Sequence, residues 1–116
     1  MPKMELSSIF HFAASHFLTQ YHGKCEHMHG HNYKLIVTIE GEIKSDGMIL
    51  DFKKIKEIVE EKILEKLDHT HLNDLIENPS AENIVVWIWE NLKNSIPLKR
   101  LTLYETDDYF CQYEGK

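Results

Sequence analysis

A regular alternation of apolar and polar residues after His29-Gly30-His31 constrains the fold more than any other feature. From His31 to Ile43 the apolar side chains occupy odd positions, at Tyr33, Leu35, Val37 and Ile39. A period of two predicts a β-strand with one buried face. His29 and His31 share the parity of that face, so both imidazoles would project from one side of the strand, about 7 Å apart.

Two imidazoles at this spacing can share one divalent metal ion, and zinc suits nitrogen ligands. A catalytic zinc typically keeps three protein ligands and an open fourth position, so the pair His29 and His31 needs a third donor. The alternative is that both histidines are surface or hydrogen-bonded residues. The spacing alone leaves the two interpretations open.

The length and charge of the chain limit its partners. With 116 residues and 42% hydrophobic content, we expect one domain covering residues 1–116, small enough that a buried site can borrow groups from a neighbouring subunit. A formal net charge of -6 at pH 7 argues against nucleic acid and anionic membranes, which require clustered Lys and Arg. No apolar run reaches the roughly 18 residues of a membrane span, so we expect a soluble, cytoplasmic protein.

The rest of the chain predicts the order strand, strand, helix, helix, strand, strand. The first strand covers Glu5 to Ala14, and an apolar stripe predicts a helix from about Phe52 to Leu67. Ser80 is expected to cap a second helix, and the segment from Lys99 to Tyr113 predicts two strands around Asp107-Asp108. Strands at both ends favour an α+β fold, with a four-stranded antiparallel sheet and both helices on one face.

Two acidic positions have candidate roles in binding or catalysis. Asp68 directly precedes His69 in a polar loop, and a carboxylate can fix the tautomer of a histidine and make it a competent acid or base. His71, in the same loop, is predicted only as a loop residue. Glu105 continues the apolar parity of its strand, where it either binds a polar ligand or serves as a bulge or salt-bridge residue.

Cys25 lies beside the histidine motif and is the candidate reactive thiol. A disulfide with Cys111 is possible in principle, but the chain has no dense cysteine framework, which favours a chemically used thiol. Cys25 is alternatively a fourth zinc ligand, which would close the metal site and make it structural. Spacing alone does not separate these two roles.

Five separate motifs resemble the family of 6-pyruvoyl-tetrahydropterin and 6-carboxy-tetrahydropterin synthases. They occur in the family's order over nearly the whole chain: Phe12-Ala13-Ala14-Ser15-His16, Cys25-x-x-x-His29-Gly30-His31-Asn32-Tyr33, Leu67-Asp68-His69, Ser80-Ala81-Glu82-Asn83 and Tyr104-Glu105-Thr106-Asp107. Several motifs at compatible spacings are far more specific than one His-x-His pair.

The resemblance implies a fold, an assembly and a site. The fold is the T-fold, whose trimers close a barrel and pair into a homohexamer with active sites between subunits. The implied cofactor is Zn2+ and the implied substrate is a pterin. The implied site residues are His16, His29 and His31 as zinc ligands, Cys25 as catalytic base, Asp68 and His69 as proton relay, Glu105 as pterin anchor, and Ser80 and Ala81 as substrate contacts.

The family's substrate is 7,8-dihydroneopterin triphosphate, and the resemblance implies a 6-carboxy- or 6-pyruvoyl-tetrahydropterin product. Three residues separate Cys25 from His29, as in the 6-carboxy branch, whereas sequences like the mammalian enzymes have five. Glu26 adds a second feature, because a related subgroup uses a glutamate three residues before His-Gly-His to cleave the side chain to 6-hydroxymethyl-7,8-dihydropterin. Having both residues resembles a combined type that serves queuosine and folate routes.

Two alternatives remain beside these implied roles. Glu26 can be a solvated loop charge. The whole chain can be a non-enzymatic, zinc-stabilised pterin-binding module with Cys25 as fourth ligand.

Overall fold

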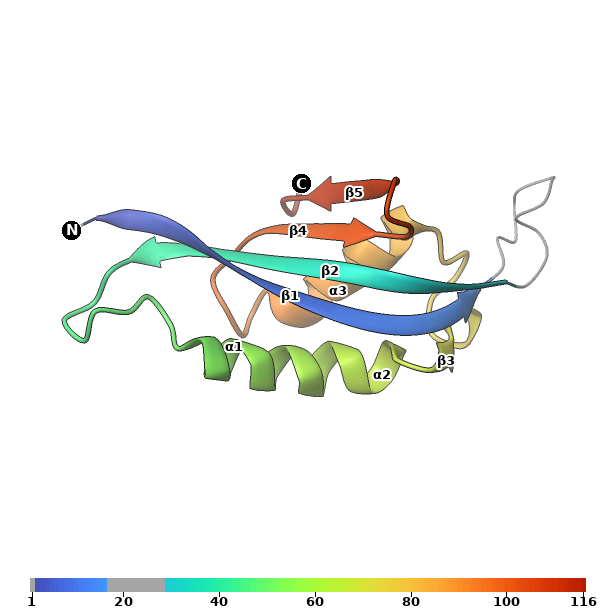
Figure 1. Cartoon of the computed structure of the whole chain (residues 1–116), viewed down its shortest axis with the longest axis horizontal. Coiled ribbons are helices and arrows are strands. Elements are labelled where there is room, and N and C mark those ends of the chain that lie inside the picture. The colour runs from blue at the N-terminus through green and yellow to red at the C-terminus, as the bar shows by residue number, and fades with distance from the viewer. Residues whose placement is uncertain (1, 17–28) are drawn as a thin grey trace.

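The computed structural model describes residues 2–16 and 29–116, and two long paired strands are its largest feature (Figure 1). Strand β1 covers Lys3–His16 and strand β2 covers His29–Glu42. They pair antiparallel without interruption, and His16 lies opposite His29 at one end of the pair. Both strands were predicted from the sequence. β1 extends two residues beyond the predicted bounds at each end, whereas β2 begins two residues earlier and ends one residue earlier than predicted.

The sheet has five strands in the order β3-β1-β2-β4-β5. Strands β4, Leu98–Tyr104, and β5, Phe110–Tyr113, extend the antiparallel part as predicted. The short strand β3, Thr70–His71, pairs parallel to β1 within a segment that the sequence predicted as a loop. The predicted four-stranded antiparallel sheet is therefore a five-stranded mixed sheet.

Two helical segments follow the predicted boundaries. The first begins at Phe52 and combines α1, Phe52–Val59, a π-helical segment, Glu60–Leu64, and α2, Glu65–Leu67. The second is α3, Ala81–Leu92. Each helical segment is preceded by a capping side chain: Asp51 accepts a hydrogen bond from the Lys53 N–H, and Ser80 accepts one from the Asn83 N–H. The prediction that Ser80 is a helix cap is confirmed.

Both helical segments share one hydrophobic core with one face of the sheet. Alternation along β1 buries its even-numbered residues from Phe10 to His16 and leaves the odd-numbered ones more exposed. The core takes alternate residues of β1, β2 and β4 and the apolar stripes of the helices: Phe10, Phe12, Tyr33, Leu35, Val37, Ile39, Ile55, Val59, Ile63, Leu67, Ile84, Val85, Ile88, Leu92, Leu101 and Leu103. The other face of the sheet has no helix over it within the described residues (Figure 1).

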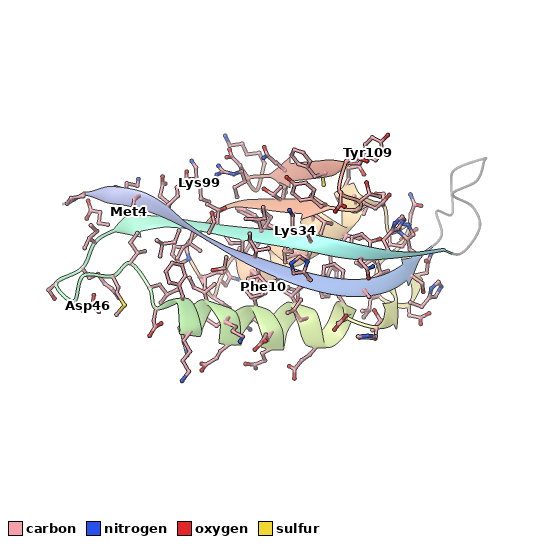
Figure 2. All side chains as sticks on the ribbon, viewed as in Figure 1. Met4, Phe10, Lys34, Asp46, Lys99 and Tyr109 are labelled. Atoms are coloured by element: carbon pink, nitrogen blue, oxygen red, sulfur yellow. The ribbon has the colours of Figure 1, made fainter. Side chains whose placement is uncertain are left out.

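The length of β1 and β2 gives the molecule an elongated shape, with extents of 53 × 24 × 24 Å. Lys34, labelled in Figure 2, lies on the sheet face away from the helices, with its ammonium 4.2 Å from the centre of the Tyr104 ring. None of the described helices combines the length and the apolar character needed to cross a bilayer.

Candidate functional site

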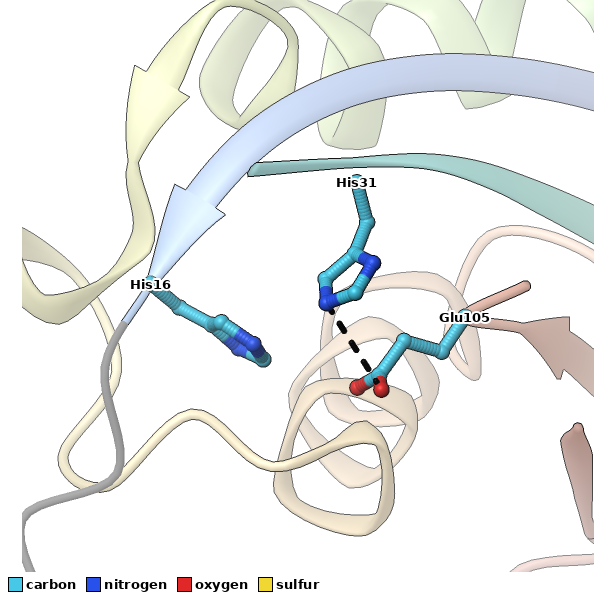
Figure 3. A group of neighbouring side chains, drawn as sticks. All are labelled: His16, His31 and Glu105. Atoms are coloured by element: carbon cyan, nitrogen blue, oxygen red, sulfur yellow. Dashed lines mark ion pairs between the residues drawn. The ribbon is translucent and has the colours of Figure 1, made fainter. Parts of the chain in front are cut away.

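Three side chains that are far apart in the sequence converge at the end of the β1–β2 pair (Figure 3). His16 ends β1, His31 lies near the start of β2, and Glu105 directly follows β4. One potential ligand atom from each side chain lies within 4.8 Å of the others. The fold thus brings together two imidazoles and a carboxylate on the core side of the sheet.

Backbone contacts orient the His16 ring within this group. His16 is 1% exposed, and its Nδ1 lies 2.7 Å from the carbonyl oxygen of Pro79, just before the cap of α3. A carbonyl can only accept, so Nδ1 carries the proton and donates it. In the neutral ring Nε2 then holds the lone pair, which is the form of histidine that binds a metal.

The electrostatics of the group are shaped by burial. The Tyr33 side chain is fully buried, and its hydroxyl lies 3.4 Å from His16 Nδ1. Burial, and to a smaller extent the negative charge of Glu105, raises the pKa of the Tyr33 hydroxyl above its ordinary value. Tyr33 therefore stays neutral at physiological pH and contributes a dipole rather than a charge.

The donor set fits a zinc ion. Imidazole nitrogen and carboxylate oxygen are both zinc ligands, and tetrahedral bonds of about 2.0–2.1 Å place ligand atoms about 3.4 Å apart. His31 Nε2 and Glu105 Oε1 are 3.7 Å apart, which is longer than a hydrogen bond and close to that spacing. The group of His16, His31 and Glu105 can accordingly bind a metal.

The predicted Asp68–His69 pair is in contact. His69 Nδ1 lies 3.1 Å from Asp68 Oδ1, although adjacent residues need not touch. The pair is held against the edge of β1, because the Ala13 N–H donates to Asp68 Oδ1 and the His69 N–H donates to the Ala13 carbonyl. His69 adopts a left-handed φ of 59° and its side chain is 82% exposed, so its imidazole is accessible.

His69 and His31 border one open cavity of about 500 Å3. A second cavity, of about 300 Å3, is lined by Ser80, Ala81 and Glu105 together with Glu82, Tyr109, Phe110 and Cys111. The two predicted substrate contacts, Ser80 and Ala81, therefore lie in one cavity with the predicted pterin anchor Glu105. Pockets of 300 Å3 and more are the usual size for small-molecule sites.

Three predicted site residues lie wholly or partly outside the part of the chain that the structure describes. Cys25 and Glu26 lie outside the described residues, and so does the side chain of His29, whose backbone is part of β2. Their roles as catalytic residues and zinc ligand stay predictions. In the described donor group the third side chain, beside His16 and His31, is Glu105. The sequence had assigned the third ligand position to His29.

Three groups at the site were not singled out from the sequence. The Pro79 carbonyl and the Tyr33 hydroxyl both contact His16. Cys111 lies in the cavity beside Glu105, and burial, with the nearby carboxylates of Glu82 and Glu105, raises the pKa of its thiol. The parity of Tyr33 with His31 was a usable signal for Tyr33, whereas the partners from residues 79 and 111 depend on tertiary packing.

Comparisons with known proteins identify the family of the chain. Residues 5–116 match the family model described as 6-pyruvoyl tetrahydropterin synthase. A dihydroneopterin monophosphate aldolase of Pyrococcus furiosus is 41% identical, with 77% of this chain and 80% of the relative covered. A 6-carboxy-5,6,7,8-tetrahydropterin synthase of Haemophilus influenzae is 30% identical over 95% of this chain and 98% of the relative.

A solved structure has the same fold as this chain. The 6-pyruvoyl tetrahydropterin synthase of Caenorhabditis elegans superposes with a TM-score of 0.91 at 28% identity, covering 100% of this chain and 98% of that one. The architecture of mixed sheet and two helical segments is therefore the T-fold of those enzymes. Sequence and structure together show that the chain belongs to the 6-pyruvoyl tetrahydropterin synthase family of pterin-converting lyases.

Proposed function

We propose that the chain is a zinc-dependent lyase that converts 7,8-dihydroneopterin triphosphate to a 6-substituted tetrahydropterin, either 6-carboxy- or 6-pyruvoyl-tetrahydropterin. The observation that carries the proposal is the convergence of His16, His31 and Glu105 in a member of this family. A closed structural site would instead require a fourth protein ligand, and Cys25 is the candidate for that role.

In the proposed site His16, His29 and His31 hold Zn2+, and Glu105 binds the pterin. Bound zinc would polarise a side-chain hydroxyl of the substrate and lower the cost of removing a proton from the adjacent carbon. The Pro79 carbonyl supports this arrangement by fixing the His16 tautomer. Glu105 borders both the metal group and the cavity of Ser80 and Ala81, where a carboxylate can accept paired N–H bonds from a pterin edge.

Proton transfer is assigned to Cys25 and to the Asp68–His69 pair. Cys25 as thiolate removes the carbon-bound proton, and His69 exchanges a proton on the opposite side of the substrate. The 3.1 Å contact between His69 Nδ1 and Asp68 Oδ1 supports the relay, because a carboxylate beside Nδ1 can fix the tautomer and the orientation of the imidazole.

A second activity is favoured by a specific resemblance. A relative that is 41% identical is a dihydroneopterin monophosphate aldolase, and Glu26 beside Cys25 supplies a carboxylate for such chemistry. We infer that Glu26 deprotonates a side-chain hydroxyl and so assists carbon–carbon cleavage to 6-hydroxymethyl-7,8-dihydropterin.

The proposed assembly is a homohexamer of two trimers with active sites between subunits. β3 pairs with β1 only at Ala14 and Ser15, so most of the outer edge of β1 has no strand partner within the described residues. The outer edge of β5 is likewise open in this part of the chain. Pairing of such edges between copies satisfies their backbone groups and closes a barrel.

The deciding experiment is product identification. Purified zinc-loaded protein is incubated with 7,8-dihydroneopterin triphosphate, and the pterin products are separated and identified. Cys25→Ala should suppress the tetrahydropterin product and spare the hydroxymethyl product, whereas Glu26→Ala should do the reverse. A protein that binds zinc through the Cys25 sulfur and turns over no substrate would establish the non-enzymatic module instead.

A further inference from the structure

The Asp68–His69 pair lies in a short turn between the end of α2 at Leu67 and the start of β3 at Thr70. Leu67 is fully buried, and its carbonyl is one of the last four of the helix, which no residue further along the helix can pair. The Thr70 hydroxyl donates to this carbonyl over 2.6 Å. One side-chain hydrogen bond therefore spans the two residues to which proton transfer is assigned.

The backbone conformation of His69 explains why this bond matters. His69 has a left-handed φ of 59°, and a residue persists in such a conformation only where the surrounding structure determines it. In the common left-handed helix cap, the N–H of that residue bonds back to the helix. Here the His69 N–H donates to the Ala13 carbonyl of β1 instead. The Thr70 hydroxyl provides a bond back to the helix from the far side of His69.

The other contacts of the turn are with β1. The Ala13 N–H donates over 2.9 Å to Asp68 Oδ1, which lies 3.1 Å from His69 Nδ1. Thr70 is paired with the next residue of β1, Ala14, in the parallel β1–β3 ladder. The turn is therefore held at two places, the end of the helix and the edge of β1, and the Thr70 hydroxyl makes the contact with the helix.

We propose that Thr70 is a positioning residue of the lyase reaction, whose hydroxyl holds the His69 imidazole where it exchanges a proton with the substrate. The proposal rests on the proposed function, because it takes His69 as the proton-transfer group. The Thr70 hydroxyl has a single proton, which the Leu67 carbonyl accepts, so Thr70 acts through the turn. Misplacing a reacting group by about 1 Å can lower a rate about a hundredfold, so a loosened turn should be visible in kcat.

Kinetics of Thr70→Val tests this role, because valine keeps the branched shape of threonine and removes the hydroxyl. With 7,8-dihydroneopterin triphosphate, kcat per zinc-loaded site should fall about tenfold at unchanged KM. Thr70→Ser keeps a hydroxyl and should restore kcat. Thr38→Val is the matched control: it removes a hydroxyl that lies 2.8 Å from Ser7 Oγ, in the half of β2 away from the metal group, and should leave kcat unchanged.

Amide hydrogen exchange, followed by NMR in substrate-free protein, measures the placement of His69 without relying on catalysis. In Thr70→Val the N–H groups of His69 and Ala13 should exchange about tenfold faster, because both are bonded within the turn. Exchange within α3 should not change, which separates a loosened turn from general destabilisation. Thr70→Ser and Thr38→Val should exchange as the wild type does.

The two measurements together decide the role of Thr70. An unchanged kcat in Thr70→Val overturns the proposal and leaves the hydroxyl as a helix cap only. A fall in kcat without faster exchange at His69 also overturns it, since the hydroxyl would then act on the substrate directly. A fall that Thr70→Ser does not reverse contradicts the role of the hydroxyl. Faster exchange in Thr70→Val of a protein whose wild type has no lyase activity would support the placement of His69 by Thr70 and overturn the proposed reaction.

Discussion

At the scale of single residues, the site combines groups whose ionisation is set by their surroundings. His16 is held in one tautomer by the Pro79 carbonyl, and burial raises the pKa of the Tyr33 hydroxyl further above physiological pH. Glu105 has two candidate roles, as a metal ligand and as a pterin anchor. It faces His31 on one side and borders the cavity of Ser80 and Ala81 on the other. Single substitutions can separate these roles.

The role of Glu105 is tested by comparing zinc content with pterin affinity. If His29 is the third zinc ligand, Glu105→Gln should leave the zinc content unchanged and weaken pterin binding about tenfold or more, since a charged acceptor of N–H bonds is lost. Metal analysis and a pterin titration of the same preparation measure both. Loss of zinc from Glu105→Gln at unchanged pterin affinity would make Glu105 a metal ligand instead.

His31→Ala provides the complementary measurement. Removing an imidazole from a three-ligand site should largely empty it of zinc while the core, which His31 only borders, stays folded. Full zinc occupancy with unchanged activity would contradict the assignment of His31.

Cys111 should react with alkylating reagents only at raised pH. Burial and the carboxylates of Glu82 and Glu105 raise the pKa of its thiol, so the reactive thiolate forms above the usual pH range for cysteine. In chelator-treated protein, alkylation of the Cys111 peptide followed by mass spectrometry should show this high midpoint. Glu82→Gln should move the midpoint to lower pH, and no movement would contradict the charge contribution.

At the scale of elements, the segment from Asp68 to His71 shows how side-chain and backbone bonds create structure that periodicity does not reveal. Two bonds to Ala13 hold the segment against β1, and β3 then pairs over two residues. In this segment His69 adopts a left-handed φ. That backbone conformation is unfavourable for residues that have a Cβ.

This backbone conformation predicts an order of stabilities. His69→Gly should be more stable than His69→Ala by about 0.5–1 kcal/mol, because glycine adopts positive φ without steric cost. Both variants lose the imidazole and should lose the proposed proton relay equally. Chemical denaturation of the two variants measures the difference, and greater stability of the alanine variant would contradict the left-handed geometry.

The sequence predicted those elements whose signals are local. The alternation of Tyr33 to Ile39 located β2, and Ser80 located the start of α3. The strand β3 was missed because two residues carry no periodicity. The His16–Pro79 contact spans 63 positions and follows from packing, which no local pattern encodes. The convergence of His16, His31 and Glu105 required the family's motifs to be recognised, or the fold to be known.

At the scale of the whole molecule, one copy leaves strand edges and one sheet face uncovered within the described residues. Ile9 and Phe110 are both more than half exposed, and both lie on that face. Closure of three such sheets into a barrel would bury them. The proposed assembly then predicts that groups of one active site come from different chains.

Within one chain His31 and His69 border the same cavity, so subunit complementation tests whether the working site instead pairs His31 of one chain with His69 of its neighbour. His31→Ala and His69→Ala are each expected to be inactive. When equal amounts are unfolded and refolded together, about a quarter of the sites should combine an intact His31 with an intact His69 from a neighbour, restoring about a quarter of the activity. The same variants refolded separately and then mixed are the control. No recovery after joint refolding would place both histidines of a site in one chain.

The turn at Pro79 connects the metal-ligand group to the cavity beside Glu105. The Pro79 carbonyl oxygen accepts a hydrogen bond from His16 Nδ1, and the next two residues, Ser80 and Ala81, line the cavity beside Glu105. A pterin that shifts this turn on binding would change the basicity of His16 as a metal ligand. Thermodynamic linkage then requires zinc to change pterin affinity by the same factor as pterin changes zinc affinity. Zinc titrations with and without bound pterin would measure this factor. Zinc binding and pterin binding would then be thermodynamically coupled through the turn at Pro79.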